Sequence, residues 1–114
     1  MSMLDIKYIV YYGRSRKDLK EATLSLTNVH INEDDRVSGS IGLTGLENFY
    51  QVNKKTSHHD LFNLINLVFK GFRQILRSYQ AANPEIKFYI KYDADVREIT
   101  VEDLFYVDDC IPEE

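Results

Sequence analysis

The first 52 residues alternate apolar with polar positions, which is the period of two that half-buried β-strands require. After Asn28 the apolar positions shift by one residue, and a β-bulge produces a shift of this kind. Short polar turns separate the segments, so the sheet is predicted to be a mainly antiparallel meander. The expected strands cover residues 4–12, 22–31, 37–43 and, as a shorter fourth strand, Asn48 to Val52.

From residue 57 to about residue 82 the apolar residues recur at steps of three and four, which predicts one long amphipathic helix. Ser57 is the expected N-cap, with Asp60 three residues later in the place of the capping-box carboxylate. Asn83 and Pro84 are expected to end the helix, because a proline cannot continue it. The predicted buried stripe consists of Leu61, Ile65, Val68, Phe72, Ile75 and Tyr79.

A last strand is predicted over residues 86–92. Its positions alternate between Ile86, Phe88, Ile90 and Tyr92 on one face and Lys87, Tyr89 and Lys91 on the other. The fold class is therefore predicted to be α+β: a mainly antiparallel sheet of about five strands (β-β-β-β-α-β), with one long helix packed on one face. At 114 residues, the range 1–114 is expected to form a single domain around one core.

Charge is distributed unevenly along the chain. Segment 93–114 carries nine carboxylates and one base, a formal charge of −8, whereas residues 1–92 carry +4. Asymmetry of this kind suggests a charged partner. The acidic segment also contains apolar residues, among them Leu104, Phe105 and Tyr106, at a density that is rare in a disordered tail. We therefore expect segment 93–114 to be partly docked on the body, near Ile99 to Val107.

No catalytic signature is found, so the chain is predicted not to be an enzyme, and no metal or other cofactor is expected. His58, His59 and Asp60 form the densest group of metal-capable side chains, but adjacent helical histidines do not share a ligand face. The spacing of Gly39, Gly42 and Gly45 is G-x-x-G-x-x-G without the lysine of a P-loop, which predicts a twisted strand. The acidic neighbours of Cys110 disfavour its thiolate and so a nucleophilic role.

Basic residues gather in the first turn and near residue 54, beside aromatic ones. Basic and aromatic side chains on a sheet are typical of RNA binding by stacking, but a pI near 5.3 argues against a direct nucleic-acid binder. The alternatives are that these charges solvate two turns or attract the acidic segment of the same chain. The residues concerned are Arg14, Arg16, Lys17, Lys20, Lys54 and Lys55, with Tyr8, Tyr11 and Tyr12 nearby.

The chain has one cysteine, which excludes an internal disulfide and fits a reducing compartment. Its first residues do not form a secretion signal, and its apolar runs are far shorter than the roughly 20 residues that span a bilayer. We expect a cytoplasmic protein without a membrane partner.

In architecture and charge the chain resembles bacterial toxin-immunity proteins of the contact-dependent inhibition type. The resemblance rests on the helix Leu61–Tyr79 on its sheet and on the acidic and aromatic stretch of residues 102–109. It implies a protein that binds a basic cognate toxin, such as a nuclease, and blocks it by occlusion. Carboxylates would steer the encounter and aromatic side chains would anchor it. The contact residues expected on this interpretation are Asp103, Phe105, Tyr106, Asp108, Asp109 and Leu67, the last from the polar face of the helix.

Two other interpretations stay open. The first is a structural or assembly subunit that self-associates, for example as a homodimer, by docking its acidic segment on the basic turns of a neighbour. The second is an enzyme with a pocket between helix and sheet, near His58 or His59. The ordinary explanations are an acidic surface that keeps the protein soluble and, for Leu67, a single exposed leucine of the common kind.

Overall fold

The structure is a computed structural model of the chain that describes residues 4–46, 52–92 and 94–103. It measures 47 × 29 × 22 Å along its principal axes. The elements are, in chain order, β1 (Ile6–Gly13), β2 (Lys20–Ile31), β3 (Val37–Thr44), β4 (Val52–His58), α1 (Leu61–Ala82), β5 (Lys87–Tyr92), β6 (Asp95–Ile99) and the 3-10 turn η2 (Val101–Asp103).

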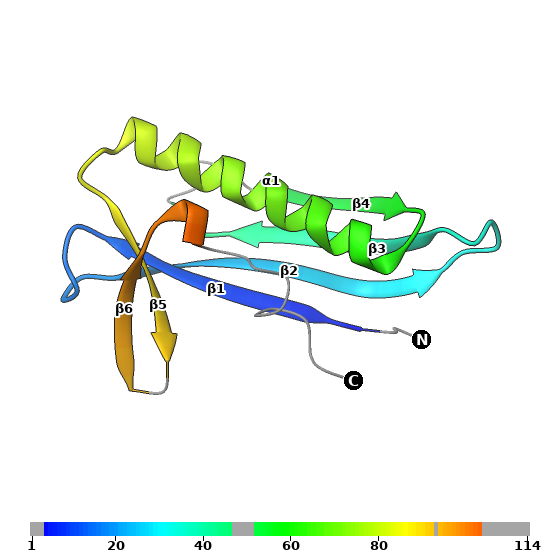
Figure 1. Cartoon of the computed structure of the whole chain (residues 1–114), viewed down its shortest axis with the longest axis horizontal. Helices are drawn as coiled ribbons and strands as arrows, with labels where there is room; N and C mark the ends of the chain where they lie inside the picture. Colours follow the sequence, from blue (N-terminus) through cyan, green and yellow to red (C-terminus); the bar gives the residue numbers. More distant parts are fainter. Residues whose placement is uncertain (1–3, 47–51, 93, 104–114) are drawn as a thin grey trace.

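The strands form one antiparallel sheet in the order β4-β3-β2-β1-β5-β6, and α1 lies across one face of it (Figure 1). This confirms the predicted α+β fold with one long helix on one face. After the helix the chain returns beside β1, so β5 and β6 extend the sheet on the side away from β4. β1 pairs with β5 only over residues 11–13, and the β5–β6 hairpin then turns away from β1 (Figure 1).

The core lies between α1 and the sheet face that the helix covers. Phe72 and Leu76 from the middle of α1 belong to one core cluster with Val10, Leu26 and Phe88 from three strands, and all five are almost completely buried. Residues at every second position of a strand point to the same face, so β2 and β3 place most of their apolar residues towards α1 and their polar residues away from it, whereas β1 also has Ile9 and Tyr11 among the residues that point away. The opposite face of the sheet is therefore left to polar side chains along β2 and β3.

A β-bulge interrupts β2 where the sequence predicts it. The register with β3 shifts between Thr27 and His30, and Asn28 has φ 56°, in the left-handed region that asparagine tolerates. Beyond the bulge Val29 points into the core and His30 points to the opposite face. The bulge thus reverses which residues of β2 face the helix.

The predictions for the fourth strand and the helix start are wrong in part. β4 runs from Val52 to His58, so the strand continues six residues beyond the predicted end at Val52; residues 48–51 of the predicted strand lie outside the described residues. The missed part pairs with β3 through its backbone, which the polar sequence around Lys55 does not reveal. Ser57 consequently lies in a strand, and the N-cap of α1 is Asp60.

A sixth strand is the other difference from the predicted order. β6 pairs with β5 over Asp95–Ile99, the first part of the acidic segment. The sequence does not predict this strand, because its two apolar residues, Val96 and Ile99, are three positions apart and only half-buried, and the other three side chains are polar and exposed. Val101 of η2 follows and is 4% exposed against the core.

Candidate functional site

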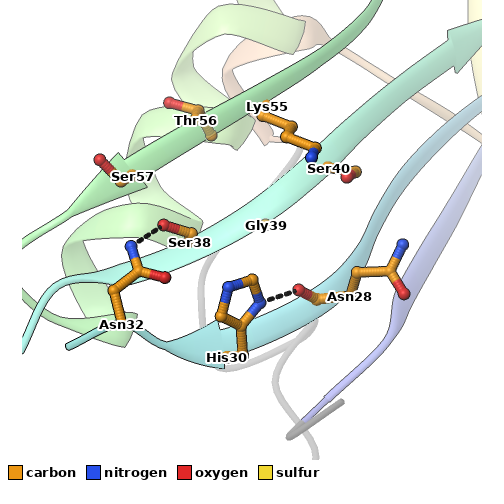
Figure 2. Close-up of a pocket in the computed structure, with 9 residues that line it drawn as sticks. All are labelled: Asn28, His30, Asn32, Ser38, Gly39, Ser40, Lys55, Thr56 and Ser57. Atoms are coloured by element: carbon orange, nitrogen blue, oxygen red, sulfur yellow. Dashed lines mark hydrogen bonds between the residues drawn. The ribbon is translucent and has the colours of Figure 1, made fainter. Parts of the chain in front are cut away.

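The face of the sheet opposite α1 contains a polar pocket of about 610 Å³ over β2, β3 and β4 (Figure 2). We call it the β2–β4 pocket. Ser38 and Ser40 belong to it because their neighbours in β3, Val37 and Gly39, are buried against the core on the helix side. The lining residues are Asn28, His30, Asn32, Ser38, Gly39, Ser40, Lys55, Thr56 and Ser57.

Strand register arranges the side chains of this pocket in two rows. In one row Ser38 lies between His30 on β2 and Ser57 on β4. In the other row Ser40 lies opposite Lys55, whose side chain extends from β4 towards it (Figure 2). Side chains directly opposite each other in antiparallel strands have Cβ atoms about 4.5–5.5 Å apart. The pairs Ser38–Ser57 and Ser40–Lys55 therefore form a compact four-residue array.

The bulge in β2 positions His30 at the rim of the pocket. Its Nδ1 lies 2.8 Å from the carbonyl oxygen of Asn28, which can only accept a hydrogen bond (Figure 2). Nδ1 therefore carries the hydrogen, and in the neutral ring Nε2 is an acceptor. The backbone N–H of Asn28 donates to Oδ1 of Asp5 over 3.2 Å, which ties the bulge to the start of β1.

Two serine hydroxyls of the array already accept hydrogen bonds from within the chain. Nδ2 of Asn32 donates to Oγ of Ser38 (Figure 2), and Nε of Arg36 donates to Oγ of Ser57 over 3.3 Å. Nη2 of Arg36 also donates to the backbone oxygen of Ser57 over 3.4 Å. A hydroxyl that accepts in this way retains its own hydrogen to donate elsewhere.

The β2–β4 pocket is lined by Lys55, by the imidazole of His30 and by amide and hydroxyl groups, without a carboxylate among the described lining residues. The carboxylates of Asp5 and Asp34 lie near its ends, and each accepts from a backbone N–H. The arrangement offers hydrogen-bond donors and one cation, which is the chemistry of anion binding. In the described part of the chain the ring of His30 contacts the backbone oxygen of Asn28, and no hydrogen bond joins it to a serine of the array.

Asp60 and the two histidines before it, His58 and His59, lie at the start of helix α1. Oδ1 of Asp60 accepts from the backbone N–H of Asn63 over 2.7 Å, and Nε2 of His59 lies 3.1 Å from Oδ2 of Asp60. The hydrogen bond from the Asn63 backbone is the main reason that the pKa of Asp60 is lowered; the side chain of Asn63 and the two histidines act in the same direction, and desolvation opposes them. Within the described residues, no group of three His, Cys, Asp or Glu side chains is placed to hold a metal ion.

The structure describes two of the six predicted contact residues, and they line different parts of the surface. Asp103 ends η2, where its Oδ2 accepts from Oγ1 of Thr100 over 2.9 Å, and it lines an open hollow with Lys7 and Lys91. Leu67 is 47% exposed on α1 and lines a small apolar groove of about 230 Å³ between α1 and β3. The other predicted contact residues, Phe105, Tyr106, Asp108 and Asp109, lie outside the described residues.

Basic residues of the body meet the described part of the acidic segment. Nε of Arg77 lies 3.3 Å from Oε1 of Glu102, and Nζ of Lys87 lies 3.7 Å from Oε1 of Glu98. A further contact is the hydrogen bond from Arg16 to the backbone oxygen of Val96. These contacts support the interpretation that the body attracts its own acidic segment.

Basic residues of the turn between β1 and β2 also contact other parts of the same chain. Arg14 pairs with Glu85 over 3.2 Å, and Arg16 reaches β6. Of the three tyrosines proposed for stacking, Tyr12 is buried, with its ring centroid 5.4 Å from that of Tyr79, and Tyr8 packs against the core. Of these three tyrosines only Tyr11 is left for stacking on a base, and its ring already has the ammonium of Lys91 4.4 Å from its centroid.

The β2–β4 pocket cannot be predicted from the sequence. The shift after Asn28 indicates the bulge, but in the sequence Lys55 stands out only as part of a basic pair. What assembles the pocket is the register of three strands, and register is set by pairing across the sheet rather than by any one segment.

No protein-family model matches the chain, and no curated protein and no solved structure is significantly similar to it. Among the described residues, no helix is both long and apolar enough to cross a membrane.

Proposed function

We propose that this chain is a non-catalytic immunity protein that binds a basic cognate toxin in the cytoplasm and blocks it by occlusion. The observation that carries the proposal is the way the acidic segment is attached. β6 hydrogen-bonds to β5, Val101 is buried, and Arg77 pairs with Glu102. The segment thus begins as part of the folded body.

This attachment matters because it fixes where the rest of the segment starts. Residues 104–114 continue from Asp103 and contain four carboxylates together with Phe105 and Tyr106. A binding segment that starts from a rigid body has less conformational entropy to lose than a free peptide of the same sequence. Carboxylates speed the encounter with a basic surface, and aromatic side chains provide buried contacts once the partners meet.

The proposal is tested with the product of the gene that neighbours this one in its native genome. Expression of that product alone should arrest a bacterial host, and co-expression of this chain should restore growth. With the two proteins purified, Asp108→Lys combined with Asp109→Lys should weaken binding by more than about 1 kcal/mol, since each change places a cation against a basic surface.

A matched control separates local contact from total charge. Glu21 and Glu33 are both exposed, and Glu21→Lys combined with Glu33→Lys changes the net charge by the same amount away from the acidic segment. We expect this control to retain most of the affinity. Equal binding by the wild type and the Asp108 and Asp109 double variant would refute the assigned contact.

Self-association is tested on the same material. Sedimentation at several concentrations should show a monomer in the absence of the toxin. A dimer that dissociates in the Asp108 and Asp109 double variant would favour the alternative of an assembly subunit.

A further inference from the structure

We propose that the β2–β4 pocket binds the phosphate group of a small phosphorylated molecule. This inference does not depend on the proposed function, because the pocket lies on the sheet face opposite α1, over β2, β3 and β4, whereas the acidic segment continues from β6 at the other edge of the sheet. It rests on the direction of the donors, on the charge and on the size of the pocket.

Ser38 and Ser57, which face each other across β3 and β4, can each donate a hydrogen bond into the pocket. Oγ of Ser38 accepts from Asn32, and Oγ of Ser57 accepts from Arg36 over 3.3 Å. Each hydroxyl is thereby left with its hydrogen to donate, and the pocket in front of them is where an acceptor would lie. Neighbouring donors of this kind suit a ligand with several closely spaced oxygen acceptors.

The adjacent pair, Ser40 and Lys55, adds a hydroxyl and a positive charge to the pocket. Their register places them opposite each other in the second row of the array, and the nitrogen of Lys55 lies by Ser40 (Figure 2). A phosphate monoester carries a charge of about −1.5 to −2 near neutral pH and three strong acceptor oxygens. A carboxylate has two oxygens and one charge, so it would satisfy fewer of the donors that converge here.

The charge of the lining and the volume of the pocket also suit a phosphate ester. A carboxylate in the lining would repel a phosphate, and among the described lining residues there is none. The volume of about 610 Å³ lies within the range of roughly 300–1,000 Å³ typical of small-molecule pockets. It exceeds the needs of inorganic phosphate alone, which favours a phosphate ester with a small organic part beside His30 and Asn28.

The test is an NMR titration of the isotope-labelled full-length chain with three probes: inorganic phosphate, glycerol 3-phosphate and adenosine monophosphate. Sodium chloride of equal ionic strength serves as the blank. We expect saturable shifts of the backbone amides of Ser38, Ser40, Lys55 and Ser57, with at least one ester binding more tightly than inorganic phosphate. Absence of saturation with all three probes, or inorganic phosphate binding more tightly than both esters, would overturn the proposal.

Two variants and a control decide whether the pocket residues are responsible. Lys55→Gln should weaken binding by about tenfold or more through loss of a charge-assisted hydrogen bond, and Ser57→Ala by a smaller factor. Lys70→Gln removes the same charge from an exposed position of α1 and should bind as the wild type does. If Lys55→Gln titrates like Lys70→Gln, the ligand does not occupy this pocket.

Discussion

The side chain of Asp60 determines where helix α1 begins. Its carboxylate accepts the backbone N–H of Asn63 over 2.7 Å and the side-chain Nδ2 of the same residue over 2.7 Å. The first turn of a helix has backbone donors without intrahelical acceptors, so such a cap stabilises the helix start. The same hydrogen bonds favour the ionised carboxylate, which lowers its pKa from the ordinary value of 3.8.

The lowered pKa predicts an acid-dependent contribution to stability. Because the folded value lies below the unfolded one, the contribution is complete above about pH 4 and is lost as the pH falls through the folded pKa. Asp60→Asn keeps an oxygen for capping but cannot titrate, so its melting temperature should fall less on acidification than that of the wild type. Asp60→Ala should melt lower than both at neutral pH. Identical acid profiles for the wild type and the asparagine variant would contradict this assignment.

Two glycines provide a contrasting pair. Gly45 has φ 104°, and a Cβ there would lie 2.4 Å from the backbone oxygen of Glu21. Gly71 lies within α1, and a Cβ there meets no heavy atom within 4 Å. Chemical denaturation should show that Gly45→Ala lowers the free energy of unfolding by roughly 1–3 kcal/mol. Gly71→Ala should raise it by about 0.5–1 kcal/mol, since alanine favours helix. A neutral Gly45→Ala would show that this turn is not constrained as described.

At the scale of elements, the short turn η2 holds the acidic segment to the body. Val101 is 4% exposed and belongs to the core, whereas Val96 of β6 is half-buried on the other face of the hairpin. Val101→Ala should therefore lower the free energy of unfolding by roughly 1–3 kcal/mol, and Val96→Ala by clearly less. Denaturant titration of both variants measures the difference. Equal costs would mean that η2 contributes no more to the fold than a half-buried strand position.

The elements also show what a sequence pattern can reveal. The helix was predictable because Ile65, Val68 and Phe72 repeat at helical spacing and bury one stripe. The bulge was predictable because the apolar residue Val29 is out of phase with the alternating apolar residues before Asn28. β4 was not, since its described side chains, such as Lys55 and Ser57, have no apolar alternation; backbone pairing with β3 stabilises it. The N-cap was misplaced for the same reason.

At the scale of the whole molecule, the sheet separates two surfaces. One face is covered by α1, and the opposite face carries the β2–β4 pocket. The pocket could not be predicted, because His30, Ser38 and Lys55 come together only through the register of three strands. The acidic segment could be predicted as a feature from charge alone, and the burial of Val101 fits the apolar residues in it; residues 104–114 lie outside the described residues. The pairing of Glu98 and Glu102 with Lys87 and Arg77 could not, because it depends on how the chain folds back.

If the acidic segment steers this protein to a basic partner, as we propose, the rate of association is the quantity that shows it most directly. Stopped-flow measurements with the purified toxin should show a rate constant that falls by about tenfold or more between low and high salt, because salt screens long-range attraction. The double variant Asp108→Lys with Asp109→Lys should be slower at low salt and should lose most of this dependence. A rate constant that is the same at both salt concentrations, or unaltered in that variant, would contradict the account.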